Sequence, residues 1–195
     1  MLIVDKEVKK QPDQIRLHLG CGDRYHSWFT HHIDLSDKPH VDIVHDASSL
    51  PMFINGSVDM IYASHILEYF DSSEVVRVLA EWRRVLKAGG LLRLAVPDFA
   101  ALCVAYNRGF PIFRLTGPLY GKMNIGKNQH IYHKMCYDYL SLSSLLRLCQ
   151  FNRIRRYEWQ ETEHADMDDW SQSYLPHMDK DNGLLISLNV ECNKI

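Results

Sequence analysis

The stretch that decides the fold is Ile15–Asp34, IRLHLGCGDRYHSWFTHHID. Its first five residues alternate between apolar and polar side chains, which predicts a half-buried β-strand. The chain then turns through Gly20-Cys21-Gly22, where glycine lets the backbone approach a ligand that a Cβ would exclude. A second short strand is expected to end at Asp34, whose carboxylate can accept hydrogen bonds from ribose hydroxyls. A strand, a glycine turn, a second strand and an acid at its tip predict a nucleotide-binding corner.

Length and composition are those of one soluble domain. The chain has 195 residues, enough for a full core, and its formal net charge of −2 does not favour nucleic acid or an anionic membrane as partner. Its five cysteines contain no CxxC pair, which indicates reduced thiols rather than disulfides or a zinc site. No apolar run is long enough to span a membrane, and residues 1–14 lack the apolar core of a signal peptide. We therefore expect a cytoplasmic protein.

Strands alternate with helices over the first half of the chain. Strands are expected at 15–19, 32–35, 41–46, 58–63 and 91–96. Asp71–Glu74 reads as a capping box that opens a helix with an apolar stripe over residues 75–86, and Gly89-Gly90 is expected to end it. A second helix follows Pro97-Asp98 and is expected to bury Phe99, Leu102, Cys103 and Tyr106. This alternation predicts an α/β fold with a mainly parallel sheet.

The second half of the chain is less regular. Residues 109–133 form a Gly/Pro-rich stretch, and loops of that length are usually functional or disordered. A helix is expected to end near Cys149, followed by strands at 153–159 and 184–190. Two strands at the end of the chain, joined by the acidic, aromatic loop 161–183, predict that the last strand turns back antiparallel.

Three sequence strings occur in a familiar order: LHLGCG at 17–22, SVDMIYASHILEYF at 57–70 and EWRRVLKAGGLLRLAVPDF at 81–99. Together with Asp34 and Asp46 they resemble a class I S-adenosylmethionine-dependent methyltransferase of the small-molecule group called type 11. The resemblance implies a Rossmann-like sheet of seven strands, the last of them antiparallel. It divides a single domain, 1–195, into a cofactor-binding half (15–108), a lid or acceptor insertion (109–136), and a C-terminal helix and strand pair (137–195) with its acidic loop (160–183).

The resemblance also implies S-adenosyl-L-methionine as cofactor and assigns the residues that hold it. Gly20, Cys21 and Gly22 would form a backbone cradle for the methionine portion, and Asp34 would hold the ribose hydroxyls. Leu35 would lie against the adenine, while Asp46 and the backbone of Ala47 would read its edge. Ser64 and His65 would face the sulfur end, and His18 stands where the family usually has an acid. The two carboxylates have alternative roles as a turn cap (Asp34) and an N-cap (Asp46).

The chain departs from the family pattern in its first half. The third glycine of the loop is absent, with Arg24 near its place, and the connections after Gly22 and Leu35 are too short for normal crossovers. We therefore expect a short first helix and no second one, which leaves one face of that half-sheet uncovered. The N-terminal segment or a second subunit, in a homodimer, is expected to supply the cover.

Four residues are candidates for catalysis. His65 follows the fourth strand, and histidine is a residue type suited to act as a base, although a packed histidine is the alternative. Asp98 follows the fifth strand, where an N-cap is the alternative. His130 and His133 are three residues apart, a spacing that fits one helical face, and both are candidates for acceptor binding or a base. Tyr120 is a candidate for lining the pocket, with a packing role as the alternative. No third ligand has a matching spacing, so no metal is expected.

The sequence predicts an enzyme that methylates a small polar acceptor, with a hydroxyl of a sugar or surface-polysaccharide precursor as the first choice. Carboxylates beside aromatic rings in loop 161–183 suit a sugar, whereas a solvated acidic loop is the plainer interpretation. Its negative field argues against nucleic acid. The alternatives are a non-catalytic subunit that binds S-adenosylmethionine, and a nicotinamide-dependent oxidoreductase, which would need a full GxGxxG.

Overall fold

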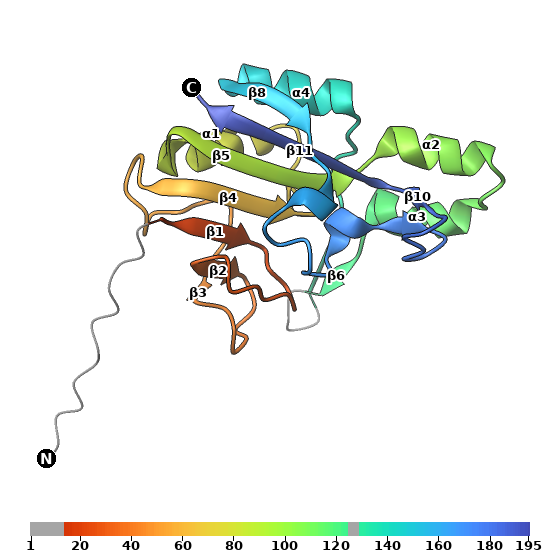
Figure 1. Ribbon diagram of the computed structural model, residues 1–195, viewed down its shortest axis with the longest axis horizontal. Coiled ribbons are helices and arrows are strands. Elements are labelled where there is room, and N and C mark those ends of the chain that lie inside the picture. Colours follow the sequence, from red (N-terminus) through yellow and green to blue (C-terminus); the bar gives the residue numbers. More distant parts are fainter. Residues whose placement is uncertain (1–13, 125–128) are drawn as a thin grey trace, which may run out of the picture.

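A computed structural model describes residues 14–124 and 129–195. Its main feature is a seven-stranded sheet in the order β3-β2-β1-β4-β5-β11-β8 (Figure 1). The strands are β1 (Arg16–Leu19), β2 (His31–Asp34), β3 (Ile43–Val44), β4 (Val58–Ser64), β5 (Leu86–Pro97), β8 (Phe151–Arg156) and β11 (Ser187–Lys194). Strands β1 to β5 pair in parallel, whereas β11 runs antiparallel to both β5 and β8. The predicted Rossmann-like methyltransferase sheet with an antiparallel last strand is confirmed.

One face of the sheet is covered by α1 (Val75–Val85) and α4 (Tyr139–Leu148). The capping box before α1 is present, because the Asp71 amide donates to the Glu74 carboxylate and the Glu74 amide donates to the Asp71 carboxylate, each over 3.0 Å. Trp82 is fully buried beneath α1, and its Nε1 donates to the Ala47 oxygen over 2.7 Å. The expected stop at Gly89-Gly90 is wrong, because α1 ends at Val85 and both glycines lie within β5.

The segment after β5 differs from expectation. Helix α2 (Phe99–Asn107) buries Leu102 and Ala105, while Phe99, Cys103 and Tyr106 are exposed, because α2 packs on α3 (Ile112–Tyr120) and not on the sheet core. The Gly/Pro-rich stretch is therefore not one long loop. It contains α3 and a small hairpin of β6 (Met123–Asn124) and β7 (His130–Ile131). None of the described helices is long and apolar enough to cross a membrane.

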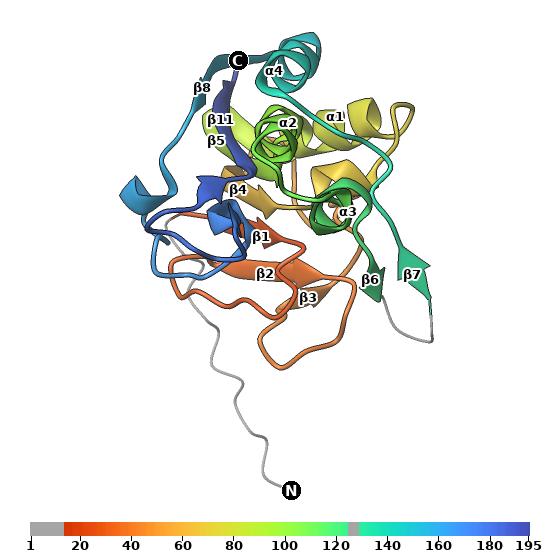
Figure 2. The ribbon, with the colours of Figure 1, turned by 90° about the vertical axis from the view of Figure 1, so that its right-hand side faces the viewer.

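The opposite face of the sheet has no crossover helix. Within residues 14–74 only the short 3-10 helix η1 (Leu67–Tyr69) is present, so the expected short helix after β1 is wrong. The face is covered instead by the C-terminal loop, which contains η2 (Trp159–Glu161) and η3 (Trp170–Gln172) and lies in front of β1 and β4 (Figure 2). Met167 packs there against Phe29, Met60 and Tyr62. The cover thus comes from the chain itself and not from a second subunit; the other expected source, residues 1–13, lies outside the described residues.

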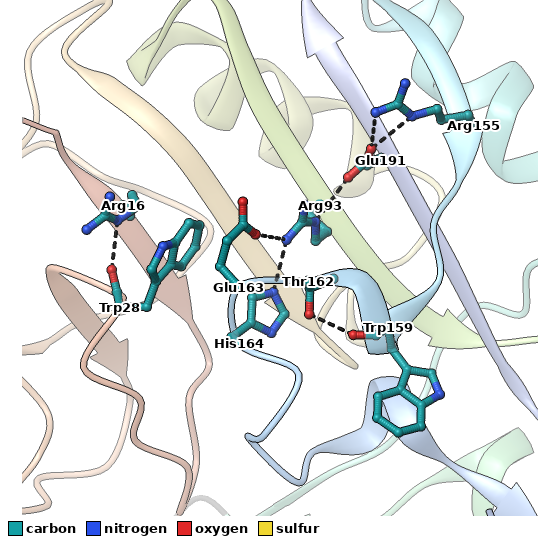
Figure 3. Close-up of polar contacts among 9 residues, drawn as sticks. All are labelled: Arg16, Trp28, Arg93, Arg155, Trp159, Thr162, Glu163, His164 and Glu191. Atoms are coloured by element: carbon teal, nitrogen blue, oxygen red, sulfur yellow. Dashed lines mark hydrogen bonds and ion pairs between the residues drawn. The ribbon is translucent and has the colours of Figure 1, made fainter.

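The covering loop is tied to the sheet by a buried ionic network around Arg93 of β5 (Figure 3). The Arg93 guanidinium donates to Glu191 of β11 and to Glu163 of the loop, each over 3.0 Å, and to His164 Nε2 over 3.2 Å. Arg155 of β8 donates to the other oxygen of Glu191 over 2.6 Å. Side chains of β5, β8, β11 and the covering loop are therefore joined in one network of ion pairs and hydrogen bonds.

This network predicts an acid-sensitive fold. Burial lowers the pKa of His164 from 6.5 to about 4, since the charged ring would lose water and face Arg93. In the unfolded chain His164 takes up a proton below pH 6.5, whereas the folded ring stays neutral down to about pH 4. The free energy of unfolding therefore decreases as the pH is lowered from 6.5 to 4, and it is constant above that range. At pH 5 this histidine should cost about 2 kcal/mol relative to pH 7.5.

Urea unfolding of the wild type and His164→Gln at pH 7.5 and pH 5 measures the effect. The loss of stability on acidification should be smaller in His164→Gln, whereas His177→Gln, a change at an exposed histidine of the same loop, should behave like the wild type. Equal pH dependence in all three proteins would contradict the prediction.

Candidate active site

A large cavity opens at the carboxyl ends of β1, β2 and β4, with a volume of about 1070 Å³. Small-molecule sites usually measure about 300–1,000 Å³, so this one has room for a nucleotide-sized cofactor and a second small molecule. Its walls come from the Gly20–Gly22 turn, the tips of β2 and β4, η1, the β6–β7 hairpin and η3. The lining includes His18, Gly20, Cys21, Gly22, Asp34, Leu35, Asp46, Ala47, Ser64 and His65, as the sequence predicts.

The Gly20–Gly22 turn has the backbone that the two glycines predict. Their φ angles are +60° and +56°, a region that L side chains rarely adopt. A Cβ on Gly20 would lie 1.9 Å from Ile66 Cδ1, whereas one on Gly22 would meet nothing within 4 Å. Burial raises the pKa of the intervening Cys21 thiol to about 12, so this thiol is not a nucleophile at neutral pH. The turn is a backbone cradle with open space on one side.

Asp34 lies at the tip of β2 beside this cradle. Its Oδ2 accepts from the Gly22 amide over 2.8 Å, and its Oδ1 accepts from the amide and hydroxyl of Ser36 over 2.8 and 2.5 Å. The turn-capping alternative is thus present in the structure. A carboxylate offers about four acceptor positions, so one remains for a ligand hydroxyl.

Asp46 follows β3 and lines the same cavity. Its Oδ1 accepts from the Ser48 amide over 2.8 Å, which is the contact expected of an N-cap. No other described residue makes a hydrogen bond to the Asp46 carboxylate. Leu35 is 49% exposed next to it, which leaves an apolar surface for a ligand ring. The acids at 34 and 46 therefore share one cavity with the glycine turn.

Two buried polar atoms in the cavity wall have no hydrogen-bond partner among the described residues, His18 Nδ1 and Ser64 Oγ. Burial lowers the pKa of His18, so the ring is neutral and one nitrogen can accept a hydrogen bond. Unpartnered buried polar atoms are costly unless a ligand or water satisfies them. Their presence fits a bound group with its own donors and acceptors.

His65 follows β4 with φ +55°, a strained conformation for a residue with a side chain. Its Nδ1 lies 3.2 Å from Oε1 of Glu68, whose side chain is completely buried, and its Nε2 lies 3.3 Å from Ser187 Oγ. The same carboxylate oxygen lies 3.7 Å from His133 Nε2. The sequence did not single out Glu68 as a site residue, because nothing local shows that its carboxylate is buried between two histidines.

Three predicted catalytic residues lie outside the cavity lining. Asp98 caps α2, accepting from the Ala100 amide over 3.0 Å, so the N-cap alternative describes it. His130 is exposed on β7. His133 is held by a contact of 2.9 Å between its Nδ1 and the Pro118 oxygen and reaches the site only through Glu68. The expected helical pairing of the two histidines is wrong, because this segment is a hairpin strand followed by an extended chain.

No cluster of metal ligands occurs among residues 14–124 and 129–195. The cavity also contains residues that the sequence did not assign, namely Tyr69, Phe70, Lys134, Asp169 and Trp170. Asp169 is buried and accepts from the Tyr62 hydroxyl over 2.5 Å, which brings the half-exposed Trp170 over the cavity. The acidic, aromatic composition of loop 161–183 was the available signal, but the residue that faces the site depends on how the loop folds back on the sheet.

Comparison with known proteins agrees with this geometry. A sequence profile of the methyltransferase domain family matches residues 17–94, which span β1 to β5. No curated protein shows significant sequence similarity to the chain.

Solved structures of similar fold include several S-adenosylmethionine-dependent methyltransferases. One from Thermotoga maritima is 15% identical, with a TM-score of 0.55 over 94% of this chain and 84% of the other. One from Methanosarcina mazei is 20% identical, with a TM-score of 0.53 over 95% and 94%. The Burkholderia thailandensis 1,6-didemethyltoxoflavin-N1-methyltransferase, solved with its substrate and S-adenosylhomocysteine, is 14% identical, with a TM-score of 0.56 over 92% and 70%.

The structural likenesses establish the fold, which is that of class I methyltransferases. The family match covers the strands that carry the cradle, Asp34, Asp46 and His65. The matched segment, residues 17–94, is therefore a methyltransferase domain with the class I fold, and S-adenosyl-L-methionine is its cofactor.

Proposed function

We propose that this enzyme transfers a methyl group to a hydroxyl of a small polar acceptor, with a sugar or sugar-containing metabolite as the favoured class. The observation that carries the proposal is that one cavity holds both the cradle with its two acids and the pair His65 and Trp170. The ring centroids of His65 and Trp170 are 6.3 Å apart. A base and an aromatic platform in one cavity suit an acceptor that has both a hydroxyl and a ring face.

On the cofactor side, the proposal gives each residue a role that its contacts allow. The backbone of residues 20–22, with the unpartnered His18 and Ser64, would hold the methionine portion. Asp34 would accept from a ribose hydroxyl with its remaining acceptor position, and Asp46 and Ala47 would face the adenine edge. Leu35 would pack on the adenine ring.

On the acceptor side, His65 is the proposed general base. The bound cofactor supplies a methyl group already activated by a positive sulfur, so the protein contributes orientation and proton removal. Nδ1 lies 3.2 Å from the Glu68 carboxylate, and Nε2 contacts Ser187 Oγ over 3.3 Å. In the proposed mechanism, Nε2 exchanges this contact for the acceptor hydroxyl and takes its proton. The buried Glu68 carboxylate, 3.2 Å from Nδ1, then stabilises the imidazolium that forms, as the carboxylate of a hydrolytic triad does for its histidine.

Trp170 and the β6–β7 hairpin are the proposed acceptor contacts. Trp170 is 52% exposed beside the base, and an indole face can stack on a sugar ring. Met123 and Ile131 of the hairpin line the same cavity, which supports the assignment of part of residues 109–136 to the acceptor side.

Replacing Asp34 should weaken cofactor binding. Asp34→Ala removes an acceptor for the ligand and leaves the amides of Gly22 and Ser36 without their partner, so the Kd for S-adenosylhomocysteine should rise by about 10–100-fold. Isothermal titration measures it. Asp34→Asn, which keeps one oxygen acceptor and favours retention of the fold, should give an intermediate Kd, while the exposed Asp181→Ala should match the wild type. A wild-type Kd for Asp34→Ala would contradict the assignment.

The acceptor class is tested by incubating the enzyme with S-adenosylmethionine and a panel of free sugars, sugar phosphates and nucleotide sugars, with mass spectrometry for a methyl gain. Methylation of a hydroxyl in that panel is the expected result. Methylation of nitrogen acceptors alone would overturn the sugar proposal. Cofactor binding without transfer to any sugar or other metabolite would favour the non-catalytic alternative.

A further inference from the structure

The segment from Phe99 to Tyr137 has a charge pattern unlike the rest of the chain. The chain as a whole contains 24 acidic residues and has a net charge of −2, yet this segment contains no Asp or Glu. Its Lys and Arg residues are Arg108, Arg114, Lys122, Lys127 and Lys134. Although the net charge of the whole chain is negative, the segment that contains α2 and α3 is therefore positively charged.

The same region exposes large apolar side chains. On α2, Phe99 and Tyr106 are 46% and 58% exposed, and on α3, Ile112, Phe113 and Tyr120 are 59%, 66% and 64% exposed. Phe99 and Tyr106 are seven residues apart, as are Phe113 and Tyr120, so each pair lies on one side of its helix. We call these five residues the α2–α3 face. Exposed apolar side chains on two helices that pack together are typical of an interaction surface.

A slot of about 300 Å³ opens between the two helices of this face. Phe99 and Tyr106 of α2 and Ile112 of α3 line it, together with the underlying Leu102, Cys103 and Leu115. Its lining is almost entirely apolar, so it suits a hydrocarbon chain and not a sugar or a nucleotide. The slot is separate from the cofactor cavity in its lining residues.

Cationic side chains flank the face without acidic partners. Among the described residues, no carboxylate lies within ion-pairing distance of Arg108, Arg114 or Lys122, and Arg114 is placed 5.5 Å from the ring centre of Phe113. Basic residues combined with exposed aromatic and aliphatic side chains are the features by which helices bind at an anionic lipid surface. An acidic protein partner would satisfy the charges, but it would not account for the hydrocarbon-like slot.

Figure 1 shows α2 and α3 at the end of the molecule toward which β1, β4 and β5 point. They project beyond the sheet, and Figure 2 shows both helices nearest the viewer at that end, with the β6–β7 hairpin beside α3. A projecting end can touch a flat surface without displacing the rest of the chain.

We propose that the α2–α3 face docks this enzyme on an anionic lipid bilayer, with the apolar residues entering the headgroup boundary and an acyl chain occupying the slot. Arg108, Arg114 and Lys122 then face lipid phosphates. The proposal is independent of the identity of the methyl acceptor.

Co-sedimentation of the full chain with vesicles tests this docking. Binding should be strong to phosphatidylcholine vesicles that contain phosphatidylserine, weak to pure phosphatidylcholine, and reduced by salt. The double variant Ile112→Ser/Phe113→Ser should weaken binding to the anionic vesicles by at least about tenfold. Arg114→Glu should weaken it by about tenfold and flatten the salt dependence.

Matched controls change similar residues elsewhere. Ile54→Ser/Leu140→Ser alters two side chains that are 76% and 72% exposed, and Arg77→Glu alters an exposed arginine of α1; all should bind vesicles as the wild type does. Binding of S-adenosylhomocysteine reports the fold of every variant. Absence of binding to anionic vesicles would overturn the proposal, as would loss of binding in the control variants. A dimer broken by Ile112→Ser/Phe113→Ser, seen by light scattering without any vesicle binding, would assign the face to a second copy instead.

Discussion

His65→Ala should lower kcat by about 10²–10⁴-fold, which is the usual contribution of a positioned general base. His65 lies in the cavity wall with its Nδ1 on the buried Glu68, so its removal takes away the proton acceptor without touching the glycine cradle or Asp34. The Kd for S-adenosylhomocysteine should therefore stay within about threefold of the wild type. Steady-state kinetics with the acceptor identified by the metabolite panel, together with titration of the cofactor product, measure both quantities.

Added imidazole separates a chemical role from a structural one. If the ring acts as a base, free imidazole should restore part of the turnover of His65→Ala, since the deletion leaves space at the reacting edge of the cavity. The exposed His177→Ala should keep wild-type turnover with or without imidazole. Unchanged kcat in His65→Ala would remove His65 from the mechanism and leave proximity alone to account for the rate.

Glu68→Gln examines the residue behind the base. The amide is close to the carboxylate in size but carries no charge, so it can still orient His65 while it no longer stabilises the imidazolium. We expect kcat to fall less than in His65→Ala, with KM for the acceptor and cofactor affinity unchanged. A change in KM or in cofactor affinity, with kcat preserved, would indicate a packing role for Glu68 and not a positioning one.

Arg93→Met should destabilise the fold by about 3 kcal/mol. The Arg93 side chain is 9% exposed and the Glu191 side chain 7%. Among the described residues, the substitution leaves Arg155 as the remaining cationic partner of the buried Glu191 carboxylate. It also releases Glu163 and His164, the contacts that hold the covering loop on β5. Since this loop carries Trp170 to the cavity, KM for the acceptor should rise as well.

Urea unfolding at pH 7.5 measures the stability change, and Arg155→Met is the matched control. Arg155 pairs with the same carboxylate but is 73% exposed, so its loss should cost no more than about 1 kcal/mol. The double variant Arg93→Met/Glu191→Leu should recover part of the loss, because it removes the buried charge together with its partner. Equal costs for the two arginine variants would show that the network does not anchor the loop.

Local patterns in the sequence were sufficient for the cofactor half. The alternating strand at Ile15–Leu19, the two glycines and Asp34 predicted a nucleotide-binding corner, and the family resemblance added Asp46. All of them line one cavity in the structure. These features are local because a turn needs glycine at its own positions and a strand end carries its own acid. The capping box at Asp71–Glu74 was found for the same reason, since all of its contacts lie within four residues.

Predictions that depended on distant contacts were weaker. The exposure of Phe99, Cys103 and Tyr106 contradicts an expectation that rested on helical periodicity, because periodicity marks an apolar face without saying whether another element covers it. The N-terminal segment or a second subunit was expected to cover the open sheet face, whereas Met167, Asp169 and the Arg93 contacts show that a segment far along the chain covers it.

The amino-acid order by itself determined the strands of the parallel half of the sheet, the glycine turn and Asp34 beside it, since each is encoded by neighbours within one turn or strand. Only the tertiary structure decided that Glu68 is buried between His65 and His133, that Asp98 caps a helix outside the cavity, and that Trp170 lies over it. The physical reason is that these arrangements depend on how hydrophobic burial and ion pairing bring separated segments together, which spacing along the chain does not specify.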